Sequence, residues 1–195
     1  MFKNQFKYLF IIVSLVALTA CSSLPTAINL APELNLDEQS YQFNQSEIWK
    51  VNSQDLRVAR HLIEIVDGDN VAQLINEQQS IRLLIENSLK QAWITNGLSI
   101  ADQSEYEIDI QLIKALTTVT EPTMSYEVET QMMLQVQLTH KNKKFAKLFR
   151  SNHQWEAPFS TSISRITEEI NTQLTELLMQ VVKDEEINAK LQSFK

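Results

Sequence analysis

Two sets of side chains in this 195-residue chain could take part in acid–base chemistry. His153 is a candidate general base, expected on one strand face with Phe145, Phe149 and Trp155. A histidine among aromatic residues is more often a packed core residue, and we favour that interpretation.

A second set consists of carboxylates expected on the solvent face of a sheet: Glu105, Glu107, Asp109, Glu127 and Glu129. Paired carboxylates can hydrolyse glycosides. Here, however, residues 105–109 and residues 127–129 are expected toward opposite ends of their hairpin. We therefore expect a non-catalytic protein.

The sequence lacks the residue patterns needed to bind nucleotide phosphates or metal ions. Two glycines leave no room for a glycine-rich phosphate loop or a dinucleotide fingerprint. Three histidines without close spacing and a single cysteine do not make a metal-ligand set. His61 and His140 are expected at strand ends without a partner. Asp67-Gly68-Asp69-Asn70 begins like a calcium loop but lacks the later ligands, so it predicts a turn. We expect neither a cofactor nor a metal.

Basic residues gather around one expected hairpin of an acidic chain. The sequence has 17 Lys and Arg against 24 Asp and Glu, a net charge of −7. The crowded residues are His140, Lys141, Lys143, Lys144, Lys147 and Arg150. One interpretation is that Lys141, Lys143, Lys144 and Lys147 contact anionic headgroups, lipopolysaccharide phosphates or an acidic protein surface. The alternative, which we favour, is a solvated tip whose charges discourage edge-to-edge strand pairing.

The first 21 residues have the layout of a secretory signal. Lys3 and Lys7 precede an apolar run of 13 residues that ends at Ala20, too short to span a bilayer. A basic start, a short apolar core and a small-residue exit are typical of a signal peptide. The exit Leu18-Thr19-Ala20-Cys21 resembles a bacterial lipobox, in which the cysteine is lipidated and becomes the first mature residue. We predict lipidation of Cys21; the alternative is a conventional signal peptide with a chance cysteine.

Lipidation would give the chain a durable anchor without a spanning helix, because two or more acyl chains hold a protein firmly in a bilayer. An Asp after the cysteine is the usual inner-membrane retention signal, and this chain has Ser22. We therefore expect an outer-membrane anchor and a body that faces the periplasm. Removal of residues 1–20 takes away two Lys and no acid, which leaves 15 basic and 24 acidic groups. That net charge of −9 argues against nucleic acid as a partner.

The mature chain divides into a lipidated N-terminus with a tether, residues 21–45, and one domain, residues 46–195. A short strand is expected over Ala27–Leu30 within the tether. Further strands are expected over residues 48–51, 61–66, 71–75, 105–112, 126–138 and 145–155. Helices are expected from a capping box at Asn76 and Gln79 to Asn96-Gly97, and along apolar stripes over residues 163–181 and 187–194. Period-two alternation predicts an α+β fold, a mainly antiparallel sheet with two long helices on one face.

Face parity also predicts the strand register. A two-residue turn at Lys141-Asn142 makes paired residue numbers sum to 283, so that Leu138 lies opposite Phe145 and Thr130 opposite His153. By the same rule, the preceding hairpin needs an even sum near 244 or 246. Ile110 then lies opposite Leu134 or Val136.

The whole pattern resembles the YajG-type lipoproteins, a family of uncharacterised Gram-negative envelope lipoproteins. The matching features are Leu18-Thr19-Ala20-Cys21, Ile28 through Leu36, Asp55-Leu56-Arg57, Ile81-Arg82-Leu83-Leu84, Lys144-x-x-Lys147-x-Phe149-Arg150-Ser151, Glu156 and Phe159. The chain departs at Lys141-Asn142, where relatives have an Asn-Gly turn, although Asn142 tolerates a positive φ. The resemblance implies an outer-membrane lipoprotein and supplies no reaction, cofactor or binding residue.

Two classes of function stay open. The first is a lipid-anchored, non-catalytic interaction or assembly module whose partner is an unidentified envelope protein or glycan. The second is a small envelope glycan hydrolase or ligand-binding lipoprotein. A cleft that holds His153 beside an acid and an exposed hydroxyl would favour the second class, whereas a filled core would favour the first.

Overall fold

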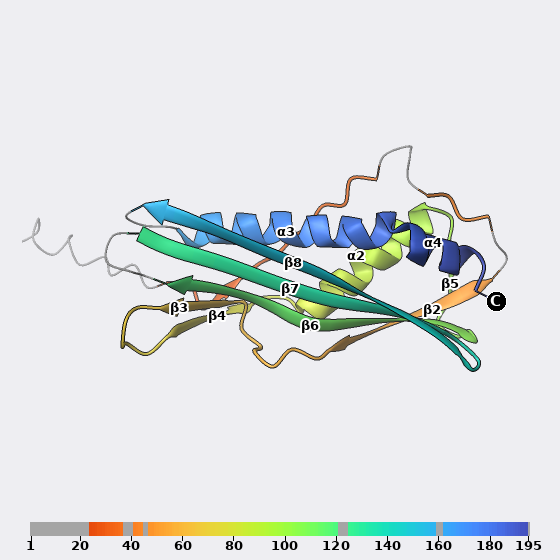
Figure 1. Cartoon of the computed structure of the whole chain (residues 1–195), viewed down its shortest axis with the longest axis horizontal. Helices are drawn as coiled ribbons and strands as arrows, with labels where there is room; N and C mark the ends of the chain where they lie inside the picture. Colours follow the sequence, from red (N-terminus) through yellow and green to blue (C-terminus); the bar gives the residue numbers. More distant parts are fainter. Residues whose placement is uncertain (1–23, 37–40, 45–46, 121–124, 159–161, 195) are drawn as a thin grey trace, which may run out of the picture.

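A computed structural model describes residues 24–36, 41–44, 47–120, 125–158 and 162–194. Those residues form an α+β domain, a curled sheet with helices on one face (Figure 1). The predicted signal peptide, Cys21 and Phe159 lie outside the described residues. None of the helices that the structure describes is long and apolar enough to cross a bilayer.

The strands and helices follow one another in a simple order along the chain. The strands are β1 (Ala27–Ile28), β2 (Ile48–Asp55), β3 (Ile63–Val66), β4 (Gln73–Glu77), β5 (Ser99–Ile100), β6 (Tyr106–Thr120), β7 (Ser125–His140) and β8 (Lys143–Pro158). The helices are α2 (Ile81–Thr95), α3 (Ile163–Lys183) and α4 (Glu185–Gln192). In the sheet, the order is β1-β4-β3-β6-β2-β5, and β7 lies between β6 and β8.

The prediction of a mainly antiparallel sheet is wrong, because the sheet is mixed. Parallel neighbours are β1–β4, β2–β5, β2–β6 and β3–β6, and antiparallel neighbours are β3–β4, β6–β7 and β7–β8. The helices in the described part of the chain cover one face of the sheet (Figure 1). Side chains therefore alternate between a buried and a wet face whatever the direction of the neighbouring strand. Alternation along a strand thus reports one-sided burial and leaves strand direction open.

The two long hairpins have the predicted register. Leu138 lies opposite Phe145 and Thr130 opposite His153, which confirms the sum of 283 for β7 and β8. Ile110 lies opposite Val136, a sum of 246 for β6 and β7. Between Leu112 and Lys114 a bulge shifts this register by one residue. The bulge exchanges the faces of β6, so that Ala115, Thr117 and Val119 are buried beyond it.

The helices differ from the prediction in one cap and in their lengths. The fold is not two long helices, because a third, short helix packs with them: Asp184 ends α3, and its side chain accepts a hydrogen bond from the Ile187 amide to start α4, at the stripe expected over residues 187–194. The expected capping box at Asn76 and Gln79 is wrong. Ser80 caps α2 instead and accepts a hydrogen bond from the Leu83 amide at 3.4 Å. The C-terminal end of α2 at Asn96-Gly97 is confirmed.

Part of the expected tether belongs to the folded domain. Ile28, Leu30 and Phe43 are buried in the core. The amide of Asn76 donates to the carbonyl of Thr26, which adds β1 to the edge of the sheet. Gly97 has φ +90, and a Cβ there would lie 2.9 Å from the Phe43 carbonyl oxygen. Apolar residues spaced along residues 28–43 account for this docking, since their burial stabilises the segment on the domain.

Candidate functional site

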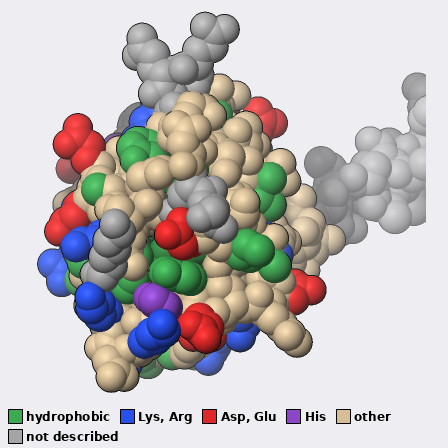
Figure 2. All heavy atoms as spheres, turned by 90° about the vertical axis from the view of Figure 1, so that its right-hand side faces the viewer, with side chains coloured by type: hydrophobic (Ala, Val, Ile, Leu, Met, Phe, Trp, Pro, Cys, Tyr) green, Lys and Arg blue, Asp and Glu red, His purple; other side chains and the backbone are tan. Residues whose placement is uncertain are grey.

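The basic hairpin, defined as Lys141, Lys143, Lys144 and Lys147, surrounds the turn between β7 and β8. This turn has two residues, as predicted, since His140 pairs with Lys143. The residue with positive φ is Lys141, at +53, rather than Asn142. Figure 2 views this end of the molecule, where basic side chains and a histidine lie beside acidic and apolar side chains.

The lysines of the basic hairpin differ in how much charge they offer to a partner. Lys147 Nζ lies 2.8 Å from Asp184 and 3.0 Å from Glu186. The hydrogen bond to Asp184, followed by the one to Glu186, raises the pKa of Lys147. Lys141 Nζ lies 3.9 Å from the Glu105 carboxylate, and both side chains are exposed. Within the described ranges, no ion pair involves Lys143 or Lys144, so these two exposed residues form the most available part of the hairpin.

An aromatic cluster packs against His140, the last residue of β7 before the basic hairpin's turn. The His140 ring stacks on Tyr106, with ring centroids 3.8 Å apart and an interplanar angle of 15°. Tyr106 in turn lies 5.2 Å from Trp49, which meets Phe194 near the end of the chain. His140 Nε2 also lies 3.8 Å from Glu105. The expectation that His140 has no partner is therefore wrong, and the stack fixes the base of the hairpin.

His153 is exposed, so the prediction of a packed core histidine is wrong. It shares the helix-covered face of β8 with Phe149, but it lines a cleft of about 140 Å³ beside α3. Ser151, Glu169, Gln173 and Glu176 also line this cleft. The Ser151 hydroxyl accepts a hydrogen bond from Gln173 Nε2 at 2.8 Å. The cleft thus has the residue types of the alternative hypothesis, yet its hydroxyl is held by an amide rather than by the histidine.

The candidate carboxylates lie on the wet face of the sheet and form two separate groups. Asp109 lies opposite Gln137, whereas Glu129 lies opposite Thr118, nine residues further along β6. That spacing corresponds to about 30 Å, beyond the roughly 10 Å that separates the two acids of a glycosidase. Neighbouring polar side chains also engage them. Asp109 accepts hydrogen bonds from Gln54 and Gln111 at 3.1 and 2.8 Å.

A buried ion-pair cluster around Arg57, not predicted as a site, joins four segments of the domain. Arg57 is 4% exposed. Its Nε and Nη2 donate to the two oxygens of Asp55 at 3.0 and 2.9 Å, and Nη2 also donates to Glu77 at 2.9 Å. Arg60 Nη1 lies 2.7 Å from Asp55. Glu77 Oε1 accepts from the Ile81 amide at 3.4 Å, so the cluster connects β2, its following loop, β4 and α2.

Opposing effects act on the pKa values of this cluster. Burial raises the pKa of Asp55, but the hydrogen bonds and charge of Arg57 outweigh it and hold that pKa below its ordinary value of 3.8. Burial lowers the pKa of Arg57, but the hydrogen bond to Asp55 and the charge of Glu77 raise it above its ordinary range. Arg57 therefore stays charged. The signal in the sequence was the acid–x–base spacing of Asp55-Leu56-Arg57, which carries no information about burial.

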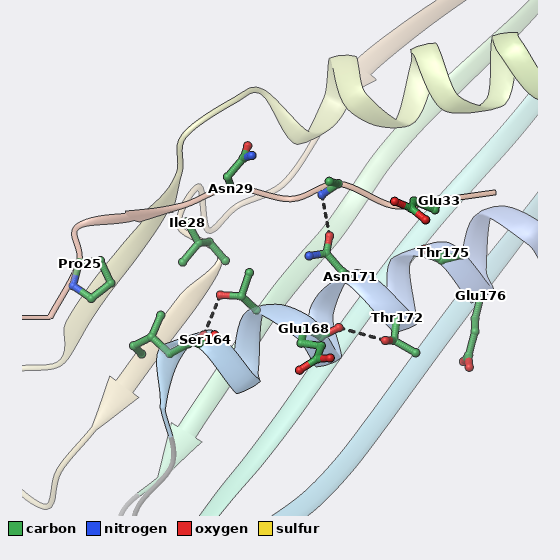
Figure 3. A pocket seen from close by; sticks show the side chains of 13 residues that line it. Pro25, Ile28, Asn29, Glu33, Ser164, Glu168, Asn171, Thr172, Thr175 and Glu176 are labelled. Atoms are coloured by element: carbon green, nitrogen blue, oxygen red, sulfur yellow. Dashed lines mark hydrogen bonds between the residues drawn. The ribbon is translucent and has the colours of Figure 1, made fainter. Parts of the chain in front are cut away.

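A groove of about 1020 Å³ runs between the N-terminal segment and the outer face of α3 (Figure 3). Asn171 Oδ1 accepts a hydrogen bond from the Ala31 amide at 2.8 Å across it. The hydroxyls of Thr167 and Thr172 donate to carbonyls of α3 itself, those of Ile163 and Glu168. These polar groups hold the segment against the helix or bond within the helix, so we assign the groove a structural role.

The curled sheet with helices on one face defines a fold class that is also found in a solved bacterial protein. The crystal structure of protein XCC0632 from Xanthomonas campestris has a TM-score of 0.62 to this chain at 14% identity, covering 87% of this chain and 99% of that one. At this identity the likeness concerns the fold.

A family model described as uncharacterized lipoprotein matches residues 32–192, and the chain belongs to this lipoprotein family. It is similar to the uncharacterized lipoprotein YajG of Escherichia coli strain K12, with 23% identity over 183 residues. The match covers 93% of this chain and 94% of that relative. YajG of Escherichia coli O6:H1 matches to the same extent. These findings confirm the YajG-type family resemblance.

Proposed function

We propose that the chain is an outer-membrane lipoprotein, held by acyl chains on Cys21, whose periplasmic body works by binding a partner and not by catalysis. Membership of a lipoprotein family, together with Leu18-Thr19-Ala20 before the single cysteine, carries this proposal. Ser22 in place of Asp after the cysteine supports the outer membrane as the destination.

The basic hairpin supports an interaction role because it presents exposed cations on an acidic protein. We propose Lys141, Lys143 and Lys144 as the contact residues for an anionic partner, either an acidic protein surface or a charged glycan. Lys147, the fourth residue of the sequence-based hypothesis, is committed to Asp184 and Glu186 and contributes less. Exposed charges act over roughly 8–10 Å at physiological salt, so this contact is expected to weaken as salt is added.

The anchor is tested by fractionation of cells that carry Cys21→Ser. We expect this variant to leave the membrane fraction or to keep its signal peptide, whereas the parent is found in the outer membrane. The matched variant Ser22→Asp keeps the cysteine, and its expected move to the inner membrane tests the sorting step alone. Normal processing and membrane retention of Cys21→Ser would contradict the proposal.

The contact is tested by photo-crosslinking from position 142 in intact envelopes. The charge-reversing pair Lys143→Glu and Lys144→Glu is expected to abolish crosslinked products that the parent forms at low salt. The pair Lys143→Arg and Lys144→Arg keeps the charge and should retain those products. Equal crosslinking by all three proteins would leave the solvated-tip interpretation in place.

A further inference from the structure

The register of the strands places two features at opposite ends of the molecule. Val66, the last residue of β3, lies opposite Thr120 at the end of β6, so the turn between β3 and β4 extends beyond that end. The β7–β8 turn lies beyond the start of β6, where Tyr106 pairs with His140. The intervening strand has 15 residues, a length of about 50 Å. Figure 1 shows the β3–β4 and β7–β8 turns at opposite ends of the sheet.

The N-terminal segment enters the domain at the same end as the β3–β4 turn. β1 runs parallel to β4, with Ala27 opposite Asn76. Because the two strands are parallel, the residues before Ala27, including Leu24, lead from β1 toward the end of the sheet where β4 starts after the β3–β4 turn. Three residues further along the chain toward the N-terminus is Cys21, and an extended chain covers at most about 3.6 Å per residue. An acyl anchor on Cys21 thus lies within about 11 Å of Leu24.

Apolar side chains are exposed at this end and do not form part of the core. Leu24 is 43% exposed, Leu74 49% and Val71 93%. The turn itself has the exposed acids Asp67 and Asp69. Those acids oppose electrostatic attraction to anionic lipids, so a bilayer contact here relies on apolar side chains at the interface.

We propose that the bilayer that holds Cys21 covers the β3–β4 end, with Leu24, Val71 and Leu74 in contact with its surface. The inference rests on the proposed lipidation of Cys21 and adds an orientation to it. The basic hairpin then points away from the anchoring bilayer, because the docked segment over residues 27–36 leaves only a short connection around which the body could turn. Its lysines meet a partner in the periplasm and not the headgroups of the anchoring membrane.

The orientation is tested with the acylated full chain in vesicles of phosphatidylethanolamine and phosphatidylglycerol. The parent has a single cysteine, which acylation occupies, so Val71→Cys and Asn142→Cys each provide one free thiol for a fluorescent label. Both positions are exposed, so neither label disturbs the core. Lipids with a nitroxide near the headgroup are expected to quench the label at position 71 several-fold more than the label at position 142.

The outcomes separate the orientation from the anchor. Equal quenching at the two positions, or stronger quenching at position 142, overturns the proposed orientation. Quenching at position 71 that disappears when Leu24 and Leu74 are both changed to Ser supports direct contact. Mass spectrometry of the same sample reports acylation of Cys21. A chain isolated from membranes without acyl groups on Cys21, or an unacylated chain that still floats with the vesicles, would overturn the proposed anchor itself.

Discussion

Arg57 and Lys147 each form ion pairs with two carboxylates, but they do so in opposite surroundings. Arg57 has a side chain only 2% exposed, against Asp55 and Glu77. The Lys147 side chain is 32% exposed, against Asp184 and Glu186. Removal of Arg57 leaves the carboxylates of Asp55 and Glu77, 17% and 20% exposed, without their shared cation in a largely buried site. An exposed pair is worth about 1 kcal/mol or less. Each cluster has one cation between two carboxylates, but the Arg57 cluster stabilises the fold whereas the Lys147 cluster is a surface contact.

Replacement of the two cations by the same apolar residue should give the largest difference. We expect Arg57→Met to lower the free energy of unfolding by about 3–5 kcal/mol, because Asp55 and Glu77 lose their shared cation. Lys147→Met should lower it by about 1 kcal/mol or less. Urea unfolding of the mature chain with Cys21→Ser measures both. Equal losses for the two variants would contradict the distinction between a buried and an exposed ion-pair cluster.

Acid should affect the buried cluster specifically. The folded pKa of Asp55 lies below 3.8, so its ion pair stabilises the fold above that pH. The stabilisation is lost as the pH falls through the folded pKa. Asp55→Asn lacks this contribution. Between about pH 5 and about pH 2, a range that brackets the ordinary pKa of Asp, its free energy of unfolding should therefore fall less than that of the parent. Asp69→Asn, in the exposed turn, serves as the control and should follow the parent.

Alkali should affect the exposed cluster, with the smallest effect. The folded pKa of Lys147 is raised above its ordinary 10.5. Its stabilisation is therefore complete below that value and is lost as the pH rises through the folded pKa. We expect the free energy of unfolding of Lys147→Met to fall less at alkaline pH than that of the parent. We also expect about 1 M salt to reduce the difference between the variant and the parent. Lys144→Met is the control, and an equal effect of both variants would contradict the assignment.

Hairpins with clear alternation could be predicted from the sequence to the residue, because a period of two and a two-residue turn leave one register. Leu138 opposite Phe145 follows directly. The second half of β6 could not be predicted in this way. The bulge after Leu112 exchanges the two faces, so the alternation loses its phase at Lys114 although the strand continues to Thr120.

The remaining differences arise from contacts between residues far apart in sequence. The partner of Arg57 in β4, Glu77, is brought beside it only by the pairing of β3 with β4 and β6. Similarly, the burial of Phe43 depends on the end of α2, where its amide donates to the Asn96 carbonyl at 2.7 Å. The sequence correctly placed the candidate lysines near a turn. The ion pairs of Lys147 with Asp184 and Glu186 could not be predicted, because the local sequence pattern does not show where α4 packs against the sheet.

The docked N-terminal segment also sets the order in which the domain can fold. Residues 27–44 leave the ribosome early, yet their hydrogen-bond partners Asn171 and Gln192 lie 140 and 148 residues further along the chain. Contacts of such separation form slowly, since a long loop must close before they stabilise anything. The segment nearest the anchor is therefore among the last to settle. A truncation that removes α4 would take away the Gln192 acceptor of the Asn44 amide. The hydrogen bonds of Thr26 with Asn76, Ala31 with Asn171 and Phe43 with Asn96 would still hold the rest of the segment.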